Sequence, residues 1–121
     1  MPTLQTMHEF SIVEALIEQV QREVERSGHD GQVQCLDLRV GRLSGVNCDA
    51  LRFAFELLSP HTIMEGAQVH IAEPKAVACC HDCGAEVEID EWQIECPECH
   101  GPNITIEGGR ELLLESIELE D

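Results

Sequence analysis

Four of the seven cysteines stand in two close pairs, Cys80/Cys83 and Cys96/Cys99, separated by twelve residues. Zinc prefers four ligands at tetrahedral corners, and thiolates about 2.3 Å from the metal suit it well. A spacer of two residues places both sulfurs of a pair on one side of a tight turn, and Gly84 lets the chain curl after the first pair. We therefore predict a zinc site closed by four thiolates. Because the protein fills every position, its predicted role is structural.

The remaining cysteines and the neighbouring histidines are interpreted differently. Cys35 and Cys48 fall on predicted secondary structure and are expected in the core, and Cys79 is interpreted as a bystander. His81 and His100 each follow a cysteine of the site. We interpret both as exposed residues beside the zinc, with a pH-dependent exchange of ligands as the alternative.

Composition excludes several classes of function. The formal net charge of the 121 residues is −17, which argues against nucleic-acid binding and suits a protein that handles cations or docks on a basic partner. No apolar run approaches the roughly 18 residues of a membrane span, and no secretory signal is recognisable, so we expect a cytoplasmic protein. In a reducing cytosol, paired cysteines indicate metal binding rather than disulfides.

Hydrophobic periodicity predicts the elements that position the cysteines. The expected elements are helices 8–27 and 49–59 and strands 33–41, 67–73 and 111–119. Asp49 is the expected N-cap of the second helix, and the apolar phase of the last strand shifts near Glu115, which indicates a bulge. The fold class is α+β: two helices packed on a three-stranded mixed sheet, with an inserted zinc-ribbon-like module.

The predicted domains are an α+β domain and a zinc-binding module. Residues 1–75 and 108–121 form the first, in which 1–6 is interpreted as an extension, and residues 76–107 form the second. The module has a local two-fold repeat, because each half carries one Cys-x-x-Cys turn.

Several short motifs occur in a characteristic order. They are Met7-His8-Glu9-Phe10-Ser11, then Val40-Gly41-Arg42-Leu43-Ser44-Gly45-Val46, Leu51-Arg52-Phe53-Ala54-Phe55-Glu56 and Thr62-Ile63-Met64-Glu65-Gly66-Ala67, the cysteine pairs, and Glu111-Leu112-Leu113-Leu114-Glu115-Ser116-Ile117. Together they resemble the hydrogenase nickel-incorporation proteins of the HypA/HybF family, from Met7 to the C-terminus.

This resemblance implies a nickel metallochaperone, not an enzyme, for maturation of nickel–iron hydrogenases. Such proteins work with a GTPase partner and pass nickel to the hydrogenase large subunit, and some serve urease maturation. By position, His8 is the side-chain nickel ligand, and Met7 and Glu9 complete the nickel-binding site within residues 1–75 and 108–121. The cysteine pairs are the zinc ligands by the same resemblance.

Two features depart from the family pattern. Six residues, Met1–Thr6, precede Met7, whereas in the family the motif stands at the start of the chain and its free amine can also ligate nickel. Arg42 stands where the family commonly has a glutamate.

Two functional alternatives stay open at this point. The cysteine loops are similar to the iron-binding loops of rubredoxin, which would make the chain an electron-transfer module. A zinc-ribbon adaptor without a nickel role is the second alternative. Catalysis is not expected, because the chain has no nucleophile elbow, phosphate-binding loop or HExxH pattern.

Overall fold

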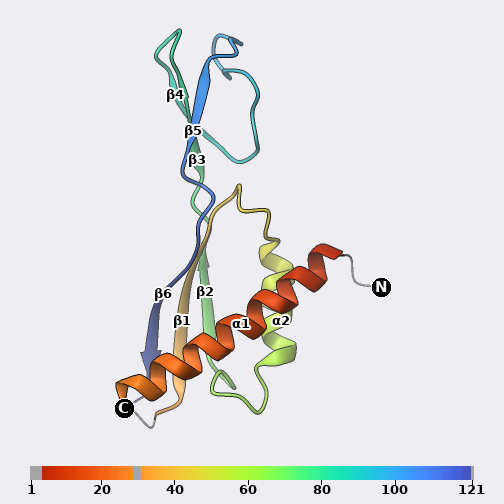
Figure 1. Cartoon of the computed structure of the whole chain (residues 1–121), viewed down its shortest axis with the longest axis vertical. Coiled ribbons are helices and arrows are strands. Elements are labelled where there is room, and N and C mark those ends of the chain that lie inside the picture. The colour runs from red at the N-terminus through yellow and green to blue at the C-terminus, as the bar shows by residue number, and fades with distance from the viewer. Residues whose placement is uncertain (1–3, 29–30, 121) are drawn as a thin grey trace. The chain divides into compact units, whose positions relative to one another are not determined.

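A computed structural model describes residues 4–28 and 31–120, with side chains from His8 onward. Figure 1 shows its elements, which are α1 (Leu4–Ser27), β1 (Val33–Val40), α2 (Cys48–Leu58), β2 (Gln68–Ala72), β3 (Ala76–Cys80), β4 (Glu86–Ile89), β5 (Ile104–Glu107) and β6 (Leu112–Leu119). Among the described residues, no helix is long and apolar enough to cross a membrane. The predicted α+β class is confirmed.

Two compact units divide the chain. The helical unit comprises Met1–Leu38, Val46–Ile71 and Leu114–Asp121, and the cysteine unit comprises Arg39–Gly45 and Ala72–Leu113. Strands β1 and β6 contribute to both units. The assignment of nickel binding to residues 1–75 and 108–121, and of zinc binding to 76–107, stays a prediction.

The helical unit packs both helices on the three-stranded sheet β2-β1-β6. β6 runs antiparallel to β1, because Glu120 N donates to Gln32 O at 3.0 Å and Gly41 N donates to Glu111 O at 2.8 Å. β2 follows β1 through the α2 crossover and runs parallel to it. The sheet therefore has one parallel and one antiparallel pair and is mixed, as predicted. The buried core draws on α1, β1, α2 and the loop after α2: Val13, Leu16, Val20, Val24, Val33, Leu36, Leu38, Leu51, Ala54, Phe55 and Met64.

The second helix begins differently from the prediction. Asn47, not Asp49, is the N-cap: its backbone is extended, and its Oδ1 accepts a hydrogen bond from Ala50 N at 3.0 Å. Asp49 lies inside the first turn, where a carboxylate favours the positive end of the helix dipole, and it pairs with Arg52 at 3.4 Å. The sequence offers two capping residues in one turn, so only the backbone conformation identifies the true cap.

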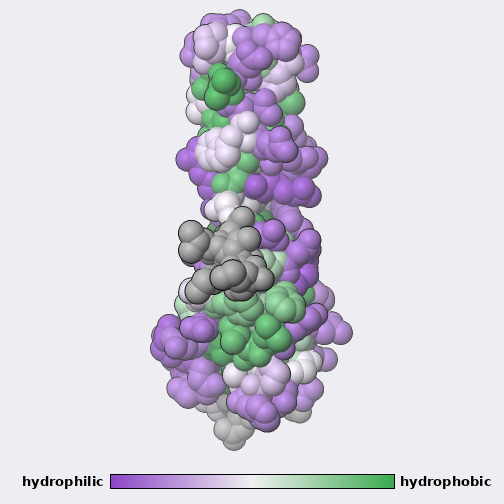
Figure 2. All heavy atoms as spheres, turned by 90° about the vertical axis from the view of Figure 1, so that its right-hand side faces the viewer, coloured by the Kyte–Doolittle hydropathy of each residue, from purple (hydrophilic) through white to green (hydrophobic). Residues whose placement is uncertain are grey.

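Apolar side chains remain exposed on one face of the helical unit. Phe53 and Leu57 on α2 are 49% and 55% exposed, and Figure 2 shows apolar side chains gathered on this face. The ring of Phe10 on α1 packs edge-on against Phe53, with centroids 6.2 Å apart. This contact attaches the start of α1, with the adjacent His8 and Glu9, to α2.

The cysteine unit contains the antiparallel sheet β4-β3-β5. Its core is small and consists of Leu43, Ala76, Ala78, Ile89 and the partly buried Ile106. Gly41 permits the close approach of two backbone segments, because an added Cβ would lie 2.1 Å from the carbonyl oxygen of Gly109. Gly109 O also accepts a hydrogen bond from Leu43 N.

Candidate metal centre

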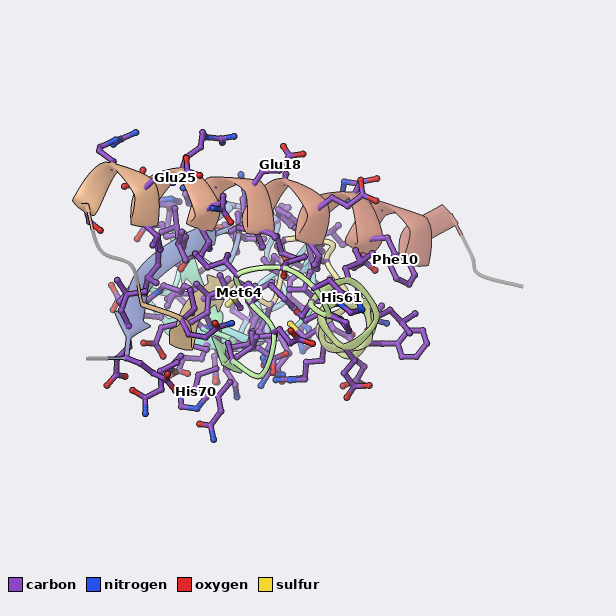
Figure 3. The ribbon with its side chains drawn as sticks, turned by 90° about the horizontal axis from the view of Figure 1, so that it is seen from below. Phe10, Glu18, Glu25, His61, Met64 and His70 are labelled. Atoms are coloured by element: carbon purple, nitrogen blue, oxygen red, sulfur yellow. The ribbon has the colours of Figure 1, made fainter. Side chains whose placement is uncertain are left out.

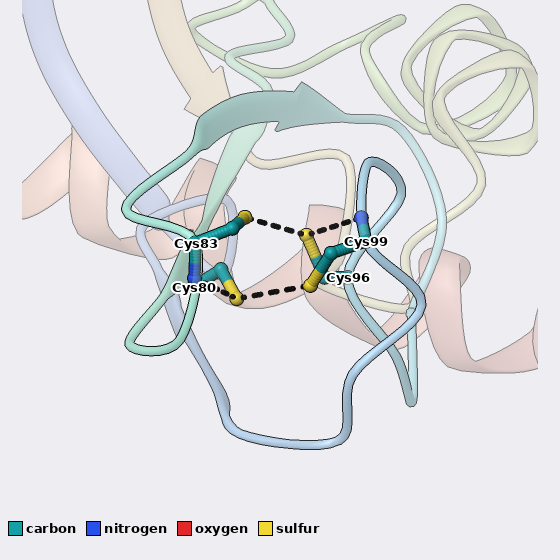
Figure 4. Close-up of side chains that lie close together, drawn as sticks. All are labelled: Cys80, Cys83, Cys96 and Cys99. Carbon is teal, nitrogen blue, oxygen red and sulfur yellow. Dashed lines mark hydrogen bonds between the residues drawn. The ribbon is translucent and has the colours of Figure 1, made fainter.

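The four paired cysteines converge at one end of the cysteine unit (Figure 4). The Sγ atoms of Cys80 and Cys99 are 3.6 Å apart, and those of Cys83 and Cys96 are 3.7 Å apart. Thiolates at tetrahedral corners about 2.3 Å from zinc would be separated by about 3.8 Å. The cluster therefore has the ligand type and spacing of a tetrahedral zinc site.

Each pair lies on a turn whose amides point at a sulfur. Cys83 N donates to Cys80 Sγ at 3.4 Å, and in the second turn Cys99 N donates to Cys96 Sγ at 3.4 Å. Each turn ends in a left-handed residue directly after its second cysteine, with φ of 77° at Gly84. The equivalent residue of the second turn, His100, has φ of 64°, a conformation that non-glycine residues adopt only occasionally. The two turns are thus similar in backbone geometry although their sequences differ.

Strand alternation explains why Cys79 is absent from this cluster. Ala76, Ala78 and Cys80 point to the buried face of β3, and Cys79 lies between them on the opposite, half-buried side. The histidines beside the cysteines also lie outside the four-sulfur group. His81 Nε2 is 2.6 Å from the hydroxyl of Thr105, and His100 Nδ1 is 3.4 Å from a carboxylate oxygen of Glu95.

Three of these thiols, those of Cys80, Cys83 and Cys99, have shifted pKa values. Amide hydrogen bonds from Cys83 and Asp82 lower the pKa of Cys80 to about 7. The pKa of Cys83 is instead raised to about 12: an amide hydrogen bond from Ala85 lowers it, but the neighbouring thiols and burial outweigh that effect. The pKa of Cys99 is raised as well, despite an amide hydrogen bond from Gly101, since thiolate formation beside Cys80 is unfavourable. A bound divalent cation would remove this penalty by compensating the accumulated charge.

The predicted nickel residues lie on the first turns of α1. His8 is exposed, whereas Glu9 is completely buried. His8 Nδ1 is 3.7 Å from Glu9 Oε1, and neither oxygen of Glu9 has a hydrogen-bond partner within the part of the chain that the structure describes. The backbone of Met7 is helical, but its side chain lies outside the described residues. An exposed imidazole therefore stands beside a buried carboxylate that has no hydrogen-bond partner among the described residues.

The structure also brings together three residues that sequence analysis did not combine. Cys35, Asp37 and His70 present ligand atoms within 4.8 Å of one another. The pattern Cys-x-Asp on a strand does place two side chains on one face. The histidine, however, comes from a different strand, and no spacing rule connects it to the other two.

Comparison with known proteins decides the family. A family model described as hydrogenase/urease nickel incorporation, metallochaperone, HypA, matches residues 7–119. The chain belongs to the HypA family. Among HypA-family relatives, the hydrogenase maturation factor HybF of Escherichia coli strain K12 is 38% identical over 115 residues, covering 94% of this chain and 100% of its own. The hydrogenase maturation factor HypA of Rhodobacter capsulatus is 38% identical over 113 residues, covering 93% and 99%.

Solved HypA structures share the fold. The solution structure of the Ni metallochaperone HypA from Helicobacter pylori matches with a TM-score of 0.59 and 22% identity, covering 92% of this chain and 96% of that one. A second solution structure of a HypA protein matches with a TM-score of 0.65 and 24% identity, covering 94% and 97%. The resemblance drawn from the motifs is therefore confirmed at the level of family and fold.

Proposed function

We propose that this chain is a nickel metallochaperone that binds Ni(II) at the start of α1 and delivers it to the large subunit during nickel–iron hydrogenase maturation. His8 supplies the side-chain ligand, Glu9 supplies a neighbouring negative charge, and Met7 contributes backbone. The observation that carries the proposal is the exposed His8 imidazole 3.7 Å from the buried Glu9 carboxylate, which lacks a hydrogen-bond partner within the described part of the chain.

A cation at His8 would relieve an unfavourable arrangement. Burial of an ionised carboxylate without a partner costs several kcal/mol, and a divalent cation held by the adjacent imidazole would offset that cost. Ni(II) accepts planar, nitrogen-rich coordination from imidazole and backbone nitrogens. Because His8 is exposed, the bound ion would also stay accessible to an acceptor protein.

The helical start of α1 predicts how the preceding residues affect this site. With α1 beginning at Leu4, the amides of Met7 and His8 stand where helix hydrogen bonds form. Ligation by these nitrogens would require the first turn to unwind. A chain that starts at Met7 would offer a free amine instead, and we expect it to bind nickel more tightly.

The cysteine cluster is proposed to hold a structural zinc ion. Cys80, Cys83, Cys96 and Cys99 would occupy every tetrahedral position, so the ion would have no open position for a substrate or a catalytic water. The hydrophobic cluster described for this unit has four buried residues, two of them alanines, with Ile106 packed against them. Metal binding would therefore supply much of its folding free energy, and we propose no catalytic activity for the chain.

The proposed partners follow from the family and from charge. The relatives are named hydrogenase maturation factors, and the family description covers both hydrogenase and urease nickel incorporation. We propose a hydrogenase-maturation GTPase and the hydrogenase large subunit as partners, with urease maturation proteins as a further set, in the cytoplasm. A net charge of −17 favours docking on basic partner surfaces.

Metal analysis of matched proteins tests the proposal. One version starts at Met1, a second starts at Met7, and His8→Ala is introduced in each, with Glu14→Ala as an exposed control on the same helix. We expect a tightly held zinc in the four-cysteine site of every version and a nickel site that is lost only in His8→Ala. A nickel titration that His8→Ala leaves unchanged would contradict the proposed site, and the zinc-ribbon adaptor would then replace the metallochaperone.

The same samples test the electron-transfer alternative. Ferric iron bound by four thiolates is red, whereas zinc is colourless. A red protein with iron in place of zinc would favour a rubredoxin-like module and contradict the structural zinc site.

A further inference from the structure

The outer face of the β2-β1-β6 sheet carries a compact polar cluster. Along β1, Leu36 and Leu38 are buried on the side of the helices, so Cys35 and Asp37 alternate onto the opposite side. His70 lies on the neighbouring strand β2, and Figure 3 shows it on the side of the sheet away from α1. The three side chains belong to the helical unit and come from strands, which are rigid supports.

The separations of these atoms match a metal site. Cys35 Sγ is 3.6 Å from His70 Nδ1, and Asp37 Oδ1 is 3.5 Å from the same nitrogen. Ligands at tetrahedral corners of zinc would lie about 3.6 Å apart for a sulfur and a nitrogen, and about 3.4 Å apart for a nitrogen and an oxygen. Thus both measured distances agree with a common tetrahedral centre.

A catalytic thiol is a poorer explanation of the same cluster. In a nucleophile–histidine–carboxylate relay, the thiol and the carboxylate contact opposite ring nitrogens. Here both Cys35 and Asp37 approach Nδ1 of His70. The pKa of the Cys35 thiol is also raised, by burial and then by the charges of Asp37 and Glu118, so the thiol is not activated as a nucleophile.

The surroundings favour a cation. Ser116 Oγ donates a hydrogen bond of 2.6 Å to Asp37 Oδ2, which orients the carboxylate while Oδ1 stays beside His70. Hydrogen bonds of this kind orient metal ligands in proteins. Cys35 is 7% exposed, whereas the side chain of His70 is 62% exposed, so the cluster has a buried sulfur and an open outer side.

We propose that Cys35, Asp37 and His70 form a second metal site, which binds a borderline divalent cation such as zinc through one sulfur, one oxygen and one nitrogen. Thiolate and imidazole select zinc and its neighbours over magnesium or calcium. With three protein ligands, the fourth position is left to water or to a group from another molecule. This site is independent of His8 and of the four paired cysteines, so it goes beyond nickel delivery.

Cobalt(II) is a suitable spectroscopic probe of this site. The full chain is prepared with zinc in the four-cysteine site and with His8→Ala, so that the proposed nickel site does not contribute. Cobalt is then titrated while visible absorption and released zinc are both recorded. We expect one equivalent of cobalt to bind with a thiolate charge-transfer band, without release of zinc, and added zinc to displace it.

Matched variants connect the signal to the cluster. Cys35→Ser should abolish the thiolate band, and His70→Ala should weaken cobalt binding at least about tenfold. Gln68→Ala changes another exposed residue of β2 and should leave the titration unchanged. Cys48→Ser is the corresponding control for a cysteine outside the cluster.

Two results would overturn the proposal. The first is the absence of a cobalt band in the His8→Ala parent. The second is a band that survives both Cys35→Ser and His70→Ala or that appears only as zinc is released, since the cobalt would then occupy the four-cysteine site. Because the parent already lacks His8, neither result bears on the proposed nickel site. His70 is exposed, so His70→Ala remains informative even if the buried Cys35→Ser variant folds poorly.

Discussion

Glu9→Gln should have opposite effects on stability and on nickel binding. Glu9 is completely buried, and neither carboxylate oxygen has a hydrogen-bond partner within residues 4–28 and 31–120. Nδ1 of the His8 imidazole lies 3.7 Å from Glu9 Oε1. Glutamine keeps the shape of the side chain and removes the charge. The nickel-free protein should then gain stability, while the nickel-bound protein loses an electrostatic contact.

The expected magnitudes follow from burial and distance. An uncompensated buried charge destabilises a fold by several kcal/mol, and an unpaired buried amide retains a penalty of about 1–3 kcal/mol. The net gain in the free energy of unfolding is therefore about 1–3 kcal/mol for Glu9→Gln. Loss of a contact between Glu9 and a cation should cost nickel binding about 1.5–3 kcal/mol, or roughly 10- to 150-fold in Kd.

Urea denaturation and nickel titration measure the two effects on the same samples. The zinc-loaded, nickel-free protein is unfolded in urea, where a change in midpoint at constant slope reports stability. Isothermal titration then gives the nickel Kd. Glu14→Gln is the matched control, because Glu14 is exposed on the same helix and its change should stay within about 0.5 kcal/mol.

One combination of results would refute this reasoning. If Glu9→Gln destabilised the nickel-free protein and left the nickel Kd unchanged, the carboxylate would have a structural partner rather than a role beside the metal. Stabilisation together with unchanged nickel affinity would separate Glu9 from the nickel site but preserve the account of its burial.

Three further predictions concern the zinc site and the fold. Zinc affinity should fall as pH decreases, because the thiols must lose their protons to bind the metal. The pKa of Cys80 is lowered to about 7 while that of Cys83 is raised to about 12, so zinc binding should release about one more proton below pH 7 than above it. Competition with a chelator across pH measures this dependence. Gly41→Ala should lower the free energy of unfolding in urea by about 3 kcal/mol, because its Cβ would lie 2.1 Å from a backbone oxygen. At Gly45 a Cβ would meet no atom within 4 Å, so Gly45→Ala should cost only the strain of its φ of 81°, about 1 kcal/mol. Asn47→Ala should lower the free energy of unfolding by about 0.5–2 kcal/mol, because the α2 cap is lost. An unchanged melting temperature would contradict that role.

Features that depend on residues close in sequence were predictable. The two Cys-x-x-Cys turns are local, because each sulfur lies three residues from its pair, so ligand type and turn geometry follow from the spacing. The two helices and the strands β1, β2 and β6 followed from hydrophobic periodicity, which reports the buried face directly. The strands β3, β4 and β5 of the cysteine unit were not predicted individually. The N-cap of α2 was a local feature that the sequence did not decide, because Asn47 and Asp49 are both good capping residues. Only the backbone conformation selects Asn47.

Features that depend on contacts between distant segments were decided by tertiary structure. The burial of Glu9 could not be deduced from the chain, because a glutamate at a helix start is ordinarily exposed and only packing encloses it. The approach of His70 to Cys35 and Asp37 depends on the register of β2 against β1, and a shift by one residue would move His70 to the other face. By itself, the sequence determined the family, the two helices, three of the strands and the two cysteine turns, because each turn closes within four residues. Tertiary structure alone decided which polar side chains lack partners and which distant ones converge, because these properties arise only when separate segments pack together.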